Sequence, residues 1–161
     1  MRKVAAIAAV PGIVAGVYVF IATFFGLTMD KLGAKAFLLH LGIFVLAIPL
    51  AIVERWSKGV NLFRGKPRWA VRSVQMLGLL FVGVFFTLLA LSHAASPDII
   101  NGEYVLNNHG KIVGHISERD YFFLKAWELR LFASGWIVLY CGLMMHWWFP
   151  RQDEWTVVMP D

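Results

Sequence analysis

The sequence predicts an all-α membrane protein with four transmembrane helices and an outward β-hairpin between the third and fourth helices. Three observations carry this prediction: four long apolar runs lack charge, basic residues gather on one side of these runs, and a turn-rich polar segment separates the last two. The 161 residues are 59% hydrophobic and 16% charged, whereas soluble domains are about a quarter charged. We therefore expect one polytopic domain, residues 1–161.

The apolar runs are long enough to cross a bilayer as helices. A spanning helix needs about 20 apolar residues for a hydrocarbon core of about 30 Å. Residues 4–27, 37–53, 73–91 and 131–149 contain no Asp, Glu, Lys or Arg. With their flanks, these runs predict spans over residues 4–27, 36–54, 72–94 and 118–149. The first run is longer than the apolar part of a secretory signal and ends without an Ala-x-Ala site, so we expect it to stay uncleaved.

The distribution of charge predicts the orientation. The termini and the segment between the second and third runs carry nine basic and four acidic residues, whereas the opposite side carries six of each. All of the net charge of +5 therefore lies on one side, and the positive-inside rule makes that side cytoplasmic. We expect an inner-membrane protein with both termini in the cytoplasm and residues 95–120 outside. Contact with anionic lipid explains the basic loop better than nucleic-acid binding, which we do not expect.

The outward segment has the composition of a hairpin. Residues 103–107 and 111–117 contain β-branched and aromatic side chains, and Asn108-His109-Gly110 between them is suited to a tight turn with positive φ. We predict a β-hairpin over residues 103–117. Ser117, followed by Asp120, predicts a helix N-cap, and the helix from residue 118 would project beyond the membrane. Because a lone hairpin is marginally stable in water, it should pack on this helix or on a partner.

This outward segment is where we expect a partner to bind. The leading hypothesis is a non-enzymatic accessory subunit of a homo- or hetero-oligomeric complex, which recognises another membrane or periplasmic protein. Ionisable groups at the border of the fourth span extend the candidate surface, although Lys125 is the expected local partner of Glu128. The candidate partner-binding residues are Tyr104, Asn107, Asn108, His109, Lys111, His115, Glu128 and Arg130.

Histidines offer an alternative function. His40 and His93 lie near the outward ends of the second and third spans, and two facing imidazoles are what a bis-histidine haem or a transition metal requires. His109 and His115 in the hairpin could complete a metal shell. No Cys, His-x-x-x-His or Glu-x-x-His spacing reinforces the pair, so the absence of a cofactor is the main expectation, with a haem- or metal-binding redox subunit as the alternative.

Small residues on the first span predict a close-packing helix face. Ala8, Gly12 and Gly16 recur every four residues, a spacing at which backbones can approach closely in a membrane. Self-association through this face would support a further alternative, an oligomeric channel.

The motifs of common enzymes are missing from the sequence. It contains no Gly-x-Ser-x-Gly, no phosphate-binding glycine loop and no zinc-protease helix, and no predicted span carries a charged residue at mid-depth. We therefore expect no catalytic activity. Size and topology also fit an immunity protein against a pore-forming toxin, an analogy without a motif behind it.

Overall fold

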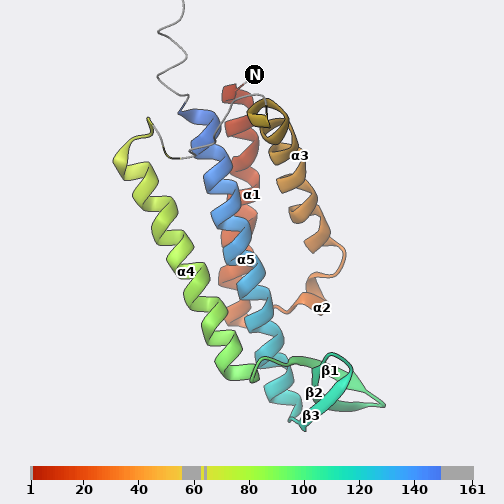
Figure 1. Cartoon of the computed structure of the whole chain (residues 1–161). Helices are drawn as coiled ribbons and strands as arrows, with labels where there is room; N and C mark the ends of the chain where they lie inside the picture. Colours follow the sequence, from red (N-terminus) through yellow and green to blue (C-terminus); the bar gives the residue numbers. More distant parts are fainter. Residues whose placement is uncertain (1, 56–62, 64, 150–161) are drawn as a thin grey trace, which may run out of the picture.

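The computed structural model describes residues 2–55, 63 and 65–149, with the backbone alone at residues 2 and 49–55 (Figure 1). Lys58, Arg64 and Arg151, which contribute to the charge argument above, lie outside the described residues. The described chain is mostly helical and includes a small antiparallel sheet.

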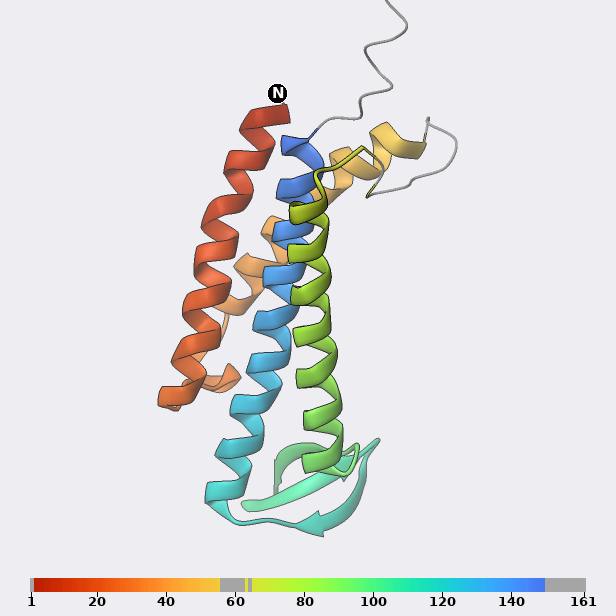
Figure 2. The ribbon, with the colours of Figure 1, turned by 90° about the vertical axis from the view of Figure 1, so that its left-hand side faces the viewer.

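Four long helices form the body of the molecule. They are α1 (Arg2–Ala22), α3 (Lys35–Arg55), α4 (Arg68–Ser92) and α5 (Glu118–Trp148). The short helices η1 (Thr23–Phe25) and α2 (Met29–Leu32) connect α1 to α3. The start of α1, the end of α3, the start of α4 and the end of α5 share one end of the bundle, while the sheet and α2 lie toward the other, which we call the sheet end (Figures 1 and 2).

Within the described residues, three helical segments are long and apolar enough to cross a membrane. These are Lys3–Phe25, Arg68–Ser92 and Glu118–Trp148, and the part of α3 with described side chains adds a shorter apolar stretch, Lys35–Ile48. The helix bounds lie within a few residues of the predicted spans. The protein is therefore suited to membrane association.

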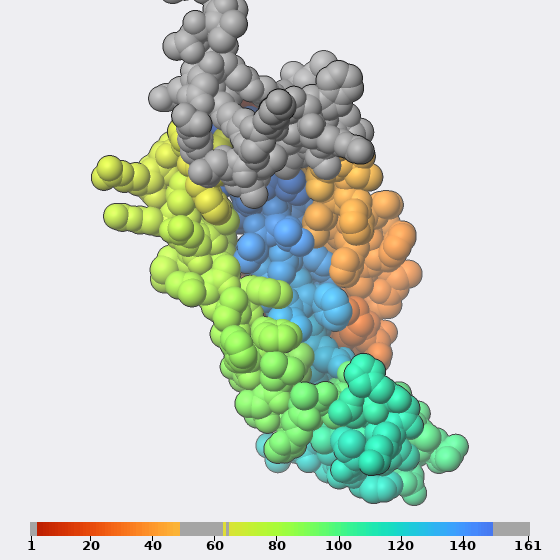
Figure 3. Space-filling view, viewed as in Figure 1, coloured from red at the N-terminus to blue at the C-terminus, as the bar shows by residue number. Residues whose placement is uncertain are grey.

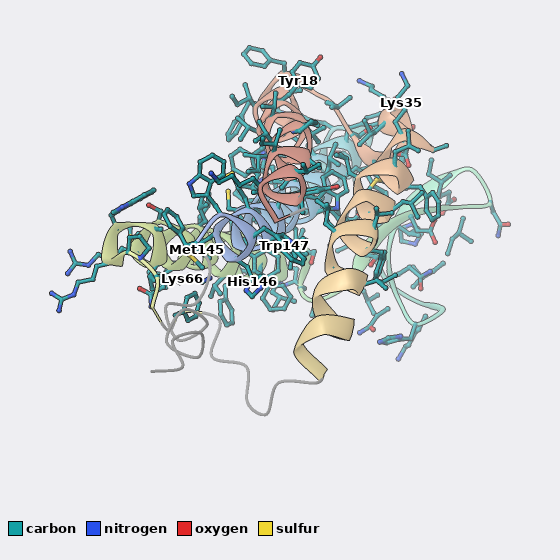
Figure 4. All side chains as sticks on the ribbon, turned by 90° about the horizontal axis from the view of Figure 1, so that it is seen from above. Tyr18, Lys35, Lys66, Met145, His146 and Trp147 are labelled. Carbon is teal, nitrogen blue, oxygen red and sulfur yellow. The ribbon has the colours of Figure 1, made fainter. Side chains whose placement is uncertain are left out.

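Helix α5 is the element on which the others pack. It lies between α3 and α4, and its most extensive contacts are with α1 and then α4 (Figure 1). The main core gathers apolar side chains of α5 with those of α1 and α3: Ala9, Val19, Ala36, Ile43, Leu129, Ala133, Trp136, Tyr140 and Leu143. Viewed along the bundle, α3 and α4 flank α5 on opposite sides (Figure 4).

Glycines let α1 approach α5 closely. A Cβ atom on Gly12 would overlap the ring of Tyr140, and one on Gly16 would lie 3.0 Å from Cγ1 of Ile137. Gly12 and Gly16 therefore lie on the face of α1 that packs on α5. Ala8, in contrast, is exposed, and Ala9 is fully buried in its place.

Helix α3 is attached more loosely. A groove of 490 Å³ separates it from α4 across α5, and a second hollow of 390 Å³ lies between it and α1. In the space-filling view, α5 forms the floor between α4 and α3 (Figure 3). Large side chains of α3 are exposed, including Phe37, Leu38 and Phe44. A membrane would supply lipid to this surface.

Lys66 joins two helices at the end of the bundle opposite the sheet end. Its ammonium group donates to the backbone carbonyls of His146, at 3.2 Å, and Phe149. Carbonyls at the end of a helix lack intrahelical partners, and a cation there is also favoured by the helix dipole. Lys66 therefore holds the start of α4 to the end of α5.

The sheet has three strands, in the order β1 (Ser96–Ile100), β2 (Glu103–Asn108) and β3 (Lys111–His115). The predicted strand pair is present as β2 and β3, and β1 adds a strand that the prediction missed. Both turns have two residues with positive φ, Asn101-Gly102 (54° and 83°) and His109-Gly110 (51° and 88°), which suits the right-handed twist of hairpin strands. Pro97 and Asp98 disfavour a strand in isolation, which explains why β1 was missed.

Candidate functional site

The start of α5 organises the sheet end. The hydroxyl of Ser117 accepts from the backbone N–H of Asp120 at 3.1 Å and donates to its carboxylate at 2.7 Å, which confirms the predicted N-cap. Glu118 and Asp120 also place negative charge in the first turn, where the helix dipole favours it. The helix therefore begins at a defined residue next to β3.

The sheet packs on the first turns of α5. Leu106 joins Ala95 and Leu124 in a small buried cluster. The ring centres of Tyr104 and Tyr121 lie 5.0 Å apart. Loss of contact with water raises the pKa of the Tyr104 phenol, and the nearby negative charge of Glu118 raises it further. The candidate residue Tyr104 is therefore half-buried against the helix.

Asn107 serves the turn. Its side-chain amide donates to Asp98 at 3.1 Å, and its carbonyl oxygen accepts from the backbone N–H of Gly110 at 2.8 Å. The bond from Asn107, together with one from the backbone N–H of Ile99, lowers the pKa of the Asp98 carboxyl below its usual range. Asn108, His109 and Lys111 are exposed around this turn. Of the candidate residues at the turn between β2 and β3, these three are exposed and available to a partner.

The remaining charged candidates differ in burial. His115 lies 3.2 Å from Glu103, with both side chains about two-thirds exposed, so the pair adds little stability. Glu128 bonds to Lys125 at 3.1 Å, as the sequence predicts, and both side chains are largely covered. The phenol of Tyr121 contacts the carboxylate of Asp30 at 3.4 Å, which joins α2 to α5.

Arg130 is buried against the end of α1, with 8% of its surface exposed. Its Nε donates to Oγ1 of Thr23 at 2.9 Å, and Nη2 donates to the Thr23 carbonyl at 3.3 Å. Its Cζ lies 4.2 Å from the ring centre of Phe24 and 4.6 Å from that of Trp127. A cation at the end of a helix is favoured by the dipole, and aromatic faces attract a guanidinium. Arg130 therefore joins α5 to α1.

The histidine pair is not brought together. His40 lies on α3 and His93 caps α4, and these helices flank α5 on opposite sides (Figure 4). Both ring nitrogens of His40 have protein partners: Nδ1 lies 3.1 Å from the Ala36 carbonyl, and the indole N–H of Trp136 donates to Nε2 at 3.4 Å. Among the described residues, no group of three or more His, Cys, Asp or Glu side chains is arranged to hold a metal ion.

Large apolar side chains are exposed around the sheet. On the strands they are Ile99, Ile112 and Val113, and on the adjoining turns of α5 they are Phe122 and Phe123. Each has between 41% and 50% of its surface exposed. The sequence analysis emphasised the polar residues of the turn and missed these five, although the consecutive apolar residues Ile112-Val113 and Phe122-Phe123 were a signal.

No protein-family model matches the chain, and neither a curated protein nor a solved structure does.

Proposed function

We propose that the chain is a four-span inner-membrane accessory protein, without catalytic activity, that recognises a partner through its sheet and the adjoining turns of α5. The single observation behind this proposal is the set of five exposed apolar side chains, Ile99, Ile112, Val113, Phe122 and Phe123, which we call the sheet patch. Contiguous exposed apolar surface outside a membrane typically marks a protein-interaction site, and we propose that these five side chains contribute to one such surface.

The length of α5 supports a position of the sheet patch beyond the hydrocarbon. Its 31 residues extend over about 46 Å at about 1.5 Å per residue, whereas the hydrocarbon core is about 30 Å thick. If Trp148 at the end of α5 lies at one border of the hydrocarbon core, about the first ten residues of α5 project past the other border. Phe122 and Phe123 fall within that projecting part, and β1–β3 pack beside it.

The four-span topology is proposed from the helix directions. The 21 residues of α3 would extend over about 31 Å, enough for a span. Since the start of α1, the end of α3, the start of α4 and the end of α5 share one end (Figure 1), each long helix would cross once. The net positive charge that the sequence assigns to that side supports a cytoplasmic position for it and an outward position for the sheet.

The strand edges favour recognition by side chains over strand addition. Pro97 on β1 has no backbone N–H, and the pairing of β2 with β3 is interrupted between Leu106 and Asn107. Such features disfavour pairing with another strand. The expected partner is therefore another membrane or periplasmic protein, or a second copy of the chain, that covers the apolar side chains directly.

The test is photo-cross-linking in native membranes with the full chain. Photoreactive residues replacing Val113 and Phe123 should each yield one discrete protein adduct. The matched control is Tyr18 on α1, which is 70% exposed but lies within a proposed span, and it should yield lipid adducts. Adducts of twice the chain mass would identify a second copy. Lipid adducts alone at Val113 and Phe123 would reject the proposal.

A further inference from the structure

The guanidinium of Arg130 has hydrogen-bond donors to spare. An arginine carries five N–H donors, and Thr23 accepts two of them, one from Nε and one from Nη2. Three N–H groups remain, two on Nη1 and one on Nη2. Among the described residues, no carboxylate pairs with Arg130, since the ion pairs there join His115 to Glu103 and Lys125 to Glu128. A buried charge without an anion is costly, so an acceptor is expected.

A second donor at the same place also lacks an acceptor. The indole N–H of Trp127 is buried and has no hydrogen-bond partner within the described part of the chain. The ring of Trp127 lies 4.6 Å from Cζ of Arg130. Two neighbouring residues of α5 therefore present unused donors beside the end of α1.

This place lies at the border of the hydrocarbon. The 21 residues of α1 extend over about 31 Å, close to the thickness of the core, and Thr23 follows directly. Arg130 lies 18 residues before Trp148 on α5, which corresponds to about 27 Å. Both helices therefore put Arg130 at the border of the hydrocarbon, from which a long arginine side chain can reach the phospholipid phosphates.

The surroundings of Arg130 point to lipid as the source of the anion. Phe24 and Phe25 on η1 are 63% and 86% exposed, which suits side chains lying among acyl chains. Lys31 donates to the carbonyl of Gly26 at 2.9 Å, so a second cation is attached to the same turn. Exposed rings beside a buried guanidinium, with a second cation on the adjoining turn, match the junction between an acyl chain and its phosphate.

We propose that Arg130 binds the phosphate of a phospholipid headgroup, with Phe24 and Trp127 holding the guanidinium in place and Lys31 adding positive charge. The Nη1 and Nη2 hydrogens left free by Thr23 form a fork that two phosphate oxygens can accept together. This site is separate from the sheet patch and does not depend on the proposed partner.

Native mass spectrometry of the full-length protein, released from nanodiscs of phosphatidylglycerol or phosphatidylcholine, tests the site. We expect one retained phospholipid per chain, with about tenfold weaker retention in Arg130→Gln, because a charge-assisted hydrogen-bond pair is lost. Arg130→Lys keeps the charge without the fork and should fall between the two. Arg119→Gln, an exposed arginine of the same helix, is the matched control and should behave as the unchanged protein.

Two further measurements separate the sources of the anion and guard against misfolding. Inorganic phosphate added to the detergent-solubilised protein should leave lipid retention unchanged; displacement of the lipid would show a general phosphate site and overturn the headgroup assignment. Brominated phospholipid should quench tryptophan fluorescence less in Trp127→Phe, which leaves Arg130 intact. Equal lipid retention by the unchanged protein, Arg130→Gln and Arg130→Lys would overturn the proposal. A protein that co-purifies with the unchanged chain but is lost in Arg130→Gln would also overturn it, because Arg130 would then bind a protein.

Discussion

Helix α5 has two contrasting neighbours, α1 and α3. The α1 side is continuous, because Gly12 and Gly16 bring the backbones together and Arg130 joins the helices at the sheet end. On the α3 side, hollows of 490 and 390 Å³ interrupt the packing, and two hydrogen bonds join the described side chains of α5 to α3. In these, the phenol of Tyr140 donates to the Leu39 carbonyl at 2.7 Å and the indole of Trp136 donates to His40.

The contrast shows which forces remain when water is absent. Within a bilayer, helices gain little from burying apolar surface, so close packing and interhelical hydrogen bonds must hold them together. Both mechanisms act on α1, whereas on α3 the hydrogen bonds lie beside packing that hollows interrupt. Tyr140 takes part in both, since its ring faces Gly12 and its hydroxyl reaches α3 beside Gly42.

The largest effect should come from breaking the α1 side. Gly12→Val places a branched side chain where the Tyr140 ring lies and should lower the free energy of unfolding by about 3 kcal/mol through overpacking. Ala8→Val introduces the same side chain at an exposed position of the same helix and should change it by less than about 0.5 kcal/mol. Reversible unfolding in bilayer mimetics measures both. Equal destabilisation would contradict the proposed packing face.

A smaller and more local effect is expected on the α3 side. Tyr140→Phe keeps the ring against Gly12 and removes only the donor to Leu39, so it should cost about 1 kcal/mol. Hydrogen exchange of α3 amides should then accelerate about fivefold, while exchange in α1 stays unchanged. Equal acceleration in α1 would show that the two sides are not independent.

The other hydrogen bond should matter less. His40→Phe retains a ring at this position and removes the acceptor of the Trp136 indole, whose bond is longer at 3.4 Å. We expect a loss of about 0.5 kcal/mol, again seen in the hydrogen exchange of α3. An effect larger than that of Tyr140→Phe would reverse the ranking of the two bonds.

Filling the groove beside α3 should make the packing of α3 on α5 more like that of α1. Ala47 lines the 490 Å³ groove, and Ala47→Leu should stabilise the attachment of α3 by about 0.5 kcal/mol and slow its exchange. Ala90→Leu on the exposed surface of α4 adds the same atoms outside the groove and serves as the control. Faster exchange in Ala47→Leu would mean that the groove cannot accept the side chain.

The sequence predicts what depends on local pattern. Apolar run length locates the helices, and Ser117 locates the start of α5. The predicted packing face of α1 differs from the observed one at its first residue. Spacing by four selects Ala8, whereas Ala9 is buried. The buried positions follow alternating steps of three and four: Ala9, Gly12, Gly16, Val19 and Thr23. An α-helix repeats every 3.6 residues, so a strict step of four drifts off the face.

Contacts between distant residues could not be predicted. Arg130 was expected as a border charge available to a partner, but it bonds to Thr23, 107 residues away in sequence. His40 was expected as a ligand candidate, but its partner Trp136 is 96 residues away. No local pattern encodes such pairings, because each depends on how two separate helices rotate toward one another.

The central position of α5 has a consequence for biosynthesis. A ribosome delivers α1, α3 and α4 to the membrane before α5, yet the most extensive contacts of α1 and α4 are with α5. If the proposed four spans insert in chain order, the three earlier helices remain weakly associated in the bilayer, and the tertiary structure forms only when the last described helix arrives. Chains that stop before residue 118 should be recognised by membrane proteases as unassembled.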